Sequence, residues 1–240
     1  MLKQNYEVQI TINGKPAREF YHEGKYYVEA REGSEFQIKI KNNSFERIVA
    51  VPSVDGLSVI DGEEASYNSR GYIINAYDSM TIDGWRKSDK EVAKFVFTDK
   101  KNSYSVKRKK GEGNIGVIGV AIFPEKAKEY NITMYKTEPL PRYTWWNDGT
   151  TCGLSCQSVS YAYSHSTTDR TLQLGTGWGD SKRSEVKSVG FERADYCTEM
   201  NIFYATSKEL INMGISLDDK PKYISPEAFP GNGYCQPPIA

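Results

Sequence analysis

The sequence predicts an all-β protein with an antiparallel β-sandwich fold. A jelly-roll topology is one form that this sandwich can take. Three observations favour this fold: repeated alternation of apolar and polar residues, frequent turn signals, and little helical pattern. Alternation with a period of two is typical of strands that bury one face. Turn signals at roughly 8–15 residue intervals are typical of sandwiches and barrels.

The first strand is expected at residues 6–12, where apolar side chains occupy every second position. Asn13 and Gly14 follow it as a two-residue turn signal. Residues 35–40 repeat the alternation, with Phe36, Ile38 and Ile40 directed inward. Further strands are expected at 47–51, 57–60, 71–75, 93–97, 116–123, 155–164 and 184–192.

Three Asp-Gly pairs punctuate the middle of the chain, at residues 55–56, 61–62 and 83–84. Asp and Gly tolerate positive φ, so such pairs between apolar residues predict tight turns. A calcium loop needs oxygen ligands at alternate positions, and Leu57 and Val59 have none. Turns are therefore favoured over metal binding, and Gly56, Gly62 and Gly84 are assigned structural roles.

One helix is expected at residues 207–213. Thr206 and Glu209 have the spacing of a capping box, and Gly214 suits the C-terminal cap. The glycine-rich run 174–180 lacks the following helix that a dinucleotide-binding loop requires, so it is interpreted as a hairpin or bulged connection.

The prolines at 139 and 141 indicate a boundary, because proline does not occupy central strands. The expected organisation is a sandwich domain over 1–135, a connector over 136–156, and a β-rich, cysteine-containing extension over 157–240 that ends in an irregular tail. The longest apolar run, 116–123, is too short to span a bilayer, and no signal peptide is apparent.

The 240 residues contain 31 Lys and Arg and 31 Asp and Glu, which gives a formal net charge of zero. This balance provides no general attraction to nucleic acid or to an anionic membrane. We therefore expect neither nucleic-acid binding nor membrane insertion. No cofactor is expected.

The four cysteines are Cys152, Cys156, Cys197 and Cys235. Their spacing allows disulfides or a shared metal site, and leaves free thiols open as well. A cysteine nucleophile, Cys152 or Cys156, would need a base such as His165. An exposed loop histidine is the simpler interpretation of His165, so no catalytic residue is assigned.

Candidate interface residues form two groups. Tyr143, Trp145 and Trp146 offer large aromatic contact area beside the prolines. The second group is the basic run of Lys107, Arg108, Lys109 and Lys110. A solvated loop between strands is the simplest interpretation of this run, and contact with phosphate or an acidic protein is the alternative.

Three segments carry a resemblance to a known family. VDGL followed by GY lies within 54–74, IDGWRKS with VAKFVF within 81–97, and NIGVIGVAIF at 114–123. This pattern resembles uncharacterised bacterial, phage and large-virus proteins. It implies a scaffold of turn glycines, core strands and a buried tryptophan, Trp85, with Arg86 stacked or capping beside it.

The expected function is that of a structural or assembly protein, a minor virion- or capsid-associated component that contacts other protein subunits without a catalytic step. The expected location is the virion, or the cytoplasm before assembly. The alternative is a β-sandwich module that binds carbohydrate or another surface ligand through Trp145, Trp146 and nearby tyrosines.

Overall fold

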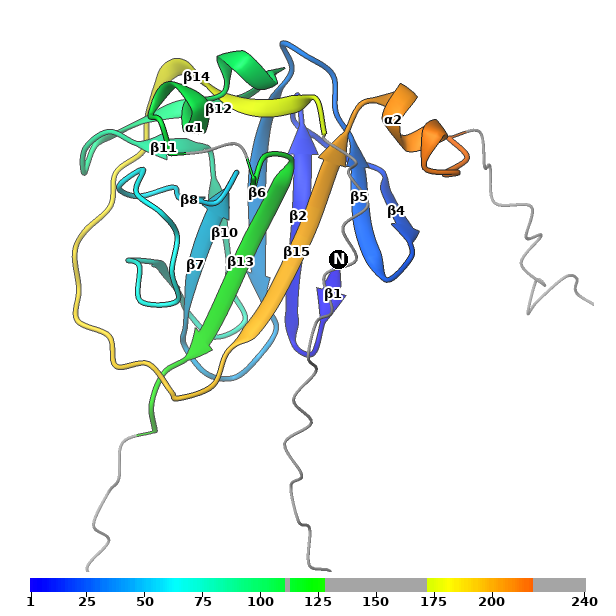
Figure 1. Ribbon diagram of the computed structural model, residues 1–240. Helices are drawn as coiled ribbons and strands as arrows, with labels where there is room; N and C mark the ends of the chain where they lie inside the picture. The colour runs from blue at the N-terminus through cyan, green and yellow to red at the C-terminus, as the bar shows by residue number, and fades with distance from the viewer. Residues whose placement is uncertain (111–112, 128–171, 218–240) are drawn as a thin grey trace, which may run out of the picture.

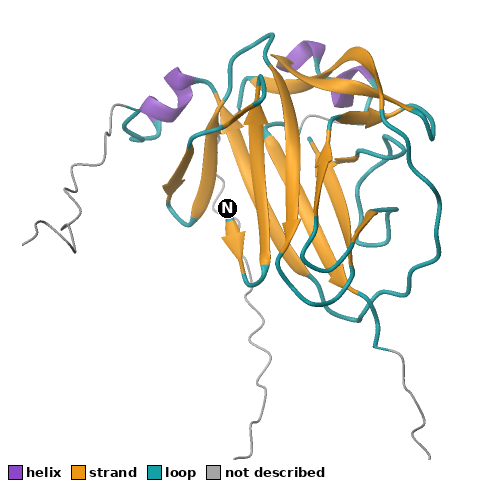
Figure 2. Cartoon of the chain, turned by 180° about the vertical axis from the view of Figure 1, so that it is seen from behind, coloured by secondary structure: helices purple, strands orange, loops and turns teal. Residues whose placement is uncertain are grey.

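The computed structural model describes residues 1–110, 113–127 and 172–217. They form two β-sheets that pack face to face, with α2 beside one edge (Figure 1). The same arrangement is visible from behind in Figure 2, where strands dominate and helices are short. The predicted all-β sandwich is therefore confirmed. In the described part of the chain, no helix is long and apolar enough to cross a membrane.

The first sheet, sheet A, has eight strands within the described residues, in the order β1-β2-β6-β12-β11. In addition, β3 pairs with β2, β10 with β6 and β14 with β12. The strands are β1 (Leu2–Lys3), β2 (Tyr6–Ile12), β3 (Lys15–Pro16), β6 (Glu35–Asn42), β10 (Ser79–Ile82), β11 (Gly84–Arg86), β12 (Glu91–Asp99) and β14 (Leu174–Arg183).

The second sheet, sheet B, has seven strands within the same residues, in the order β4-β5-β15-β13-β7-β8, with β9 also paired to β7. β15 and β5 run parallel, whereas the other pairs are antiparallel. The strands are β4 (Glu19–His22), β5 (Lys25–Glu29), β7 (Ile48–Val54), β8 (Leu57–Ser58), β9 (Tyr72–Ile74), β13 (Val117–Pro124) and β15 (Thr198–Ala205).

The core lies between the sheets and takes alternate residues from both. In β2, Val8 and Ile10 are buried, whereas Glu7 and Gln9 are partly exposed. The ring of Phe36 stacks on Phe97 with centroids 4.3 Å apart, which places aromatic contacts at the centre of sheet A. The period-two pattern thus decides which face of each strand is buried.

The sequence interpretation of the second half of the chain needs correction, because residues 172–217 complete the sandwich. β15 lies between β5 and β13 in sheet B, and β14 pairs with β12 in sheet A. The division at residue 135 therefore does not separate residues 172–217 from the sandwich. The run 174–180 belongs to a strand and is not a hairpin, although the register with β12 shifts beside Trp178, as expected for the bulged alternative. Residues 184–192, which were expected to be a strand, have no regular structure.

The basic segment after β12 also differs from the expected loop. It begins with the 3₁₀ turn η1 (Lys100–Asn102) and the short helix α1 (Tyr104–Lys107). The Ser103 hydroxyl caps α1 by accepting a hydrogen bond from the Val106 amide at 3.4 Å. Capping by Asp99 and Ser103 thus stabilises two short helical turns in this charged segment, whose lysine side chains at 101 and 107 stay exposed.

The capping box predicted for the C-terminal helix is present, and α2 spans Ser207–Asn212. The Glu209 amide donates to the Thr206 hydroxyl at 3.2 Å, and the Thr206 amide donates to the Glu209 carboxylate at 2.7 Å. Gly214 follows the helix with φ of 87°, in the left-handed region that favours glycine.

Thr206→Ala is expected to lower the free energy of unfolding by about 1 kcal/mol, because it removes the acceptor for the Glu209 amide. Urea denaturation of the full chain measures the change. Lys208→Ala is the matched control, since Lys208 is exposed in the same helix and alanine is a good helix former. Equal stability of the Thr206 variant and the wild-type chain would contradict the structural role of the cap.

Candidate binding surfaces

Most of the aromatic and cysteine candidates predicted from sequence lie outside the described residues. These are Tyr143, Trp145, Trp146, Cys152, Cys156, His165 and Cys235. Cys197 is described, and it is an exposed free thiol immediately before β15. Across residues 1–110, 113–127 and 172–217, no group of three or more His, Cys, Asp or Glu side chains is placed to hold a metal ion.

The basic run is partly neutralised by its own chain. Glu63 accepts hydrogen bonds from Arg108 at 2.7 Å and from Lys110 at 2.6 Å. Lys110, assisted by Arg108, lowers the pKa of the Glu63 carboxyl below its ordinary value. Exposed pairs of this kind contribute little to stability, but they reduce the positive charge available to a phosphate backbone. Lys107 and Lys109 remain exposed.

The Asp-Gly pairs differ from one another in structure. Asp55 and Gly56, with φ of 52° and 76°, form the tight turn between β7 and β8, as predicted. Gly62, with φ of 69°, also fits the predicted turn. The third pair does not form a tight turn with positive φ, because Gly84 begins β11. A Cβ atom on Gly84 would lie 1.9 Å from the Ala93 carbonyl oxygen, so this glycine allows close contact between strands.

Asp55 is the centre of a buried polar cluster that joins the two sheets. Its carboxylate accepts hydrogen bonds from the Gly116 amide at 3.0 Å, the Thr176 amide at 2.7 Å and the Tyr204 hydroxyl at 2.5 Å. Because the Tyr204 hydroxyl has one proton, the Thr176 hydroxyl donates to the Tyr204 oxygen, 2.9 Å away. The residue before β13 and residues from β14 and β15 are thereby connected to the turn after β7.

The pKa values of Asp55 and Tyr204 in this cluster are raised, but we interpret the role of the cluster as structural. Burial raises the pKa of Asp55 to about 6, although the three hydrogen bonds oppose the shift. Burial and the neighbouring Asp55 raise the pKa of Tyr204 well above its ordinary value. Only 4% of Asp55 is exposed, and its two oxygens are directed at groups of the same chain. We therefore infer that Asp55 has a structural role and connects strands of the two sheets. The spacing of residues in the sequence alone does not indicate this role.

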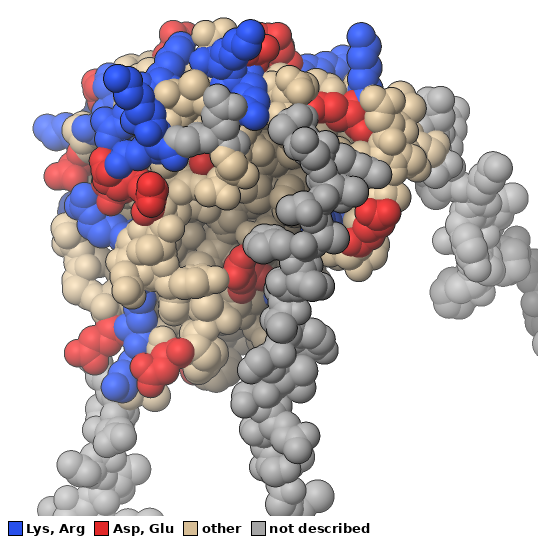
Figure 3. All heavy atoms as spheres, viewed as in Figure 1, with Lys and Arg blue, Asp and Glu red and all other residues tan. Residues whose placement is uncertain are grey.

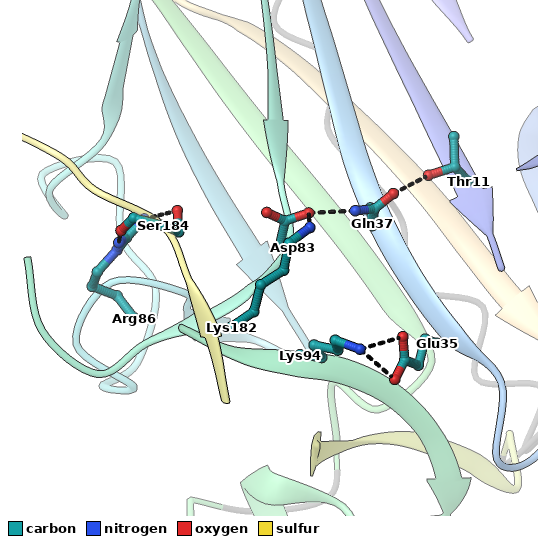
Figure 4. Close-up of polar contacts among 8 residues, drawn as sticks. All are labelled: Thr11, Glu35, Gln37, Asp83, Arg86, Lys94, Lys182 and Ser184. Carbon is teal, nitrogen blue, oxygen red and sulfur yellow. Dashed lines mark hydrogen bonds and ion pairs between the residues drawn. The ribbon is translucent and has the colours of Figure 1, made fainter. Parts of the chain in front are cut away.

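The outer face of sheet A is crossed by polar side chains that bond to one another (Figure 4). The Thr11 hydroxyl donates to Gln37 at 3.2 Å, and Gln37 in turn donates to Asp83. Asp83 also pairs with Lys182, with 2.9 Å between the charged atoms. Such a cross-strand network is typical of a solvated face that satisfies its own hydrogen bonds.

Arg86 has the role that its position beside Trp85 suggested. Its guanidinium carbon lies 5.6 Å from the centre of the Tyr72 ring, and one of its nitrogens donates to the Ser184 carbonyl at 2.5 Å. Figure 4 shows this contact with Ser184 at the edge of sheet A. The stacked and bonded guanidinium connects β9 and β11 to the start of the irregular segment after β14. Trp85 itself is buried, as the family resemblance implied.

Three exposed aromatic side chains belong to loops at one end of the sandwich: the loop between β6 and β7, the loop between β9 and β10, and the segment before β15. They are Phe45, Tyr77 and Tyr196, with 75%, 71% and 65% of their surface exposed. We call this surface the aromatic end. The loops that carry these residues meet there: the Tyr77 amide donates to the Ser44 carbonyl at 3.1 Å. The Asn43 amide donates to the Asn5 carbonyl at 2.8 Å, and Thr198 donates to Gln4 at 2.5 Å.

A buried asparagine orders the loop that carries Phe45. The Asn42 side chain donates to the Glu46 carbonyl at 2.8 Å and the Asn75 carbonyl at 2.9 Å. Its oxygen accepts from the Ser44 hydroxyl at 2.6 Å. Asn42 thus fastens the loop after β6 to the loop before β10. Because the residues on both sides of Phe45 are bonded in this way, the backbone that carries Phe45 is held in a fixed position.

Comparison with protein-family models, with curated proteins and with solved structures finds no match for this chain. The fold and the surfaces therefore define the protein only as a class: a two-sheet β-sandwich with a self-bonded polar face and an aromatic end.

Proposed function

We propose that this chain is a structural or assembly protein that binds another protein subunit through the aromatic end. A minor component of a virus or phage particle is the specific form of this role, which the resemblance of residues 54–123 to phage and large-virus proteins motivates. The observation that carries the proposal is the presence of three exposed aromatic side chains on loops that hydrogen bonds hold together.

Aromatic side chains support a protein partner because they contribute a large part of the binding energy at many interfaces. Phe45 has no polar group of its own to compensate for contact with water. Tyr77 has φ of 56°, in a region that non-glycine residues rarely occupy and that persists where the surrounding structure enforces it. Preorganised loops lose less conformational entropy when a partner binds than flexible ones do.

Co-purification tests the proposal. A tagged full-length chain is expressed in its native source, and bound proteins are quantified by mass spectrometry beside the protein content of purified particles. The double variant Phe45→Ser, Tyr77→Ser is expected to recover at least about tenfold less of the partner protein than the wild-type chain. The reason is that loss of one interface hot spot corresponds to about 2 kcal/mol or more of binding free energy.

Tyr21→Ser is the matched control, since Tyr21 is 68% exposed but lies on β4, away from the aromatic end. The control is expected to recover the partner as the wild-type chain does. All three chains should have similar melting temperatures, because the substituted residues are exposed. Equal recovery by the double variant, or the absence of the chain from every assembly, would contradict the proposal.

A further inference from the structure

The outer face of sheet B contains a groove that the assembly role does not use. Apolar clusters cover this face on both sides of its centre: Phe191 packs near Val51 and Phe123, and Leu210 of α2 packs near Phe20. Between them lies a cavity of about 290 Å³. Figure 3 shows this face as largely uncharged and hollow at its centre, with Lys and Arg gathered near the upper edge.

The groove exists because the central strand has small outward side chains. Gly119 and Ala121 of β13 are its floor, and in the register Gly119 lies opposite Ser53 of β7 and Asn201 of β15. The φ of Gly119 is not in the left-handed region, so its backbone does not require glycine. A Cβ atom there would lie 2.8 Å from the Ser53 hydroxyl and 3.1 Å from the Asn201 amide oxygen.

Glycine within a central strand weakens the sheet and often marks a site where another group approaches closely. The two oxygens nearest to the vacant Cβ position belong to Ser53 and Asn201. They lie on either side of Gly119, at the distance where a hydrogen-bonding ligand could contact both. The groove therefore differs from an ordinary depression between side chains. Gly119 has no side chain, and the Ser53 hydroxyl and the Asn201 amide oxygen both face the space that is left.

One wall of the groove is aromatic and held in place. The Tyr67 hydroxyl donates to the Glu199 carboxylate at 2.8 Å, and the Asn201 amide donates to the other Glu199 oxygen at 2.6 Å. The loop that carries Tyr67 is fastened by Arg193, which donates to the Tyr67 carbonyl and, at 2.6 Å, to the Ser69 carbonyl. Tyr67 is thus an exposed ring at a fixed position beside oriented polar groups.

The lining selects the class of ligand. Glu199 is the charged residue among those that line the groove in the described structure, so an anionic ligand such as phosphate would meet repulsion. The remaining lining combines an aromatic ring, short apolar side chains, a hydroxyl and amides. Ligand sites typically pair such apolar surface with a few placed polar groups. A sugar ring matches both parts, with its C–H face against Tyr67 and its hydroxyls toward Glu199 and Asn201.

From these contacts we propose that the groove over Gly119 binds a neutral carbohydrate of one or two sugar rings. The hydroxyl groups donate to the Glu199 carboxylate and the Asn201 amide oxygen, while Ser53 completes the polar floor. The site lies on a sheet face and shares no residue with the aromatic end. The carbohydrate proposal is therefore tested independently of the proposed assembly function.

Ligand-observed NMR with the full chain tests this site. The probes are glucose, galactose, mannose and N-acetylglucosamine, together with cellobiose, maltose and lactose, and inorganic phosphate is the anionic comparison. At least one sugar is expected to show saturation transfer, and phosphate is expected to show no binding. Gly119→Val is expected to lower the affinity for the sugar at least about tenfold, because the added side chain occupies the position of the ligand.

Asn201→Ala provides a second variant that leaves the floor open, and an affinity loss of about 2–10-fold is expected for one neutral hydrogen bond. Tyr21→Ala is the control and should bind the sugar as the wild-type chain does. Absence of binding by every sugar, binding of phosphate in preference, or unchanged affinity of both groove variants would overturn the proposal.

Discussion

Asp55→Ala is expected to lower the free energy of unfolding by about 3–5 kcal/mol at pH 7. The change leaves the Gly116 amide, the Thr176 amide and the Tyr204 hydroxyl without their common acceptor, and each unsatisfied buried group costs about 1–3 kcal/mol. Alanine also tolerates the φ of 52° less well than aspartate does. Equilibrium urea denaturation followed by tryptophan fluorescence measures the loss.

Asp55→Asn is the matched control for Asp55→Ala. Asparagine has nearly the same shape and also tolerates a positive φ, but its amide nitrogen faces a donor where aspartate has an oxygen. It removes the buried charge at the same time, which offsets part of the loss. We therefore expect its stability to lie between those of the wild-type chain and the alanine variant. An alanine variant as stable as the wild-type chain would show that the cluster does not join the sheets.

The same residue sets a pH dependence. Because burial raises the folded pKa of Asp55 to about 6 from an ordinary value of 3.8, the folded state binds the proton more tightly than the unfolded state. This contribution to stability is complete below about pH 4 and is lost as the pH rises through about 6. Relative to Asp55→Asn, the wild-type chain should lose up to about 3 kcal/mol between pH 4 and pH 7. The free energy of unfolding of both chains is measured by urea denaturation from pH 4 to pH 7. Parallel pH dependence of the two chains would contradict this role of Asp55.

Trp85→Ala is expected to lower the free energy of unfolding by about 3–5 kcal/mol. Trp85 is buried, its indole N–H donates to the Gly177 carbonyl at 3.1 Å, and its ring lies 4.7 Å from Tyr104 and 5.3 Å from Phe95 between centroids. The substitution leaves a cavity where β11, β12, β14 and α1 meet.

Trp178→Ala is the control for this loss, because Trp178 lies on β14 close to the same cluster but is exposed, with its ring 4.9 Å from Tyr104. We expect a loss below about 1 kcal/mol there, since an exposed side chain excludes little surface from water. Thermal and urea denaturation of both variants measures the difference. Similar losses at the two positions would show that Trp85 is not the centre of this cluster.

Much of the fold was predictable from local pattern. The alternation at residues 6–12 coincides with β2, and the capping residues Thr206 and Glu209 define the start of α2. Such features were visible because neighbouring residues alone determine them. β15 carries the same signal, since Thr198, Met200, Ile202 and Tyr204 alternate with more exposed residues, yet it was not predicted.

Other features depend on residues far apart in the chain. β14 was misread because its glycines have low strand propensity, but Gly175 and Gly179 let Ser103 and the Lys94 backbone approach closely. The alternation at 184–192 predicted a strand, but this segment has isolated backbone hydrogen bonds, such as that from Val186 to Asp89, and forms no ladder in the described structure. The link between Asp55 and Tyr204 spans 149 residues, so no local pattern reveals it. The aromatic end likewise arises only when three separate loops meet.

Photocrosslinking tests the central claim, contact with a protein partner at the aromatic end, most directly. A photoreactive phenylalanine analogue replaces Phe45 in the full chain, in its native source, and replaces Tyr21 in a parallel chain with similar exposure. The account predicts a discrete crosslink to one protein partner from position 45 and none to that partner from position 21. Equal crosslinking from both positions, or none from position 45 during assembly, would contradict it.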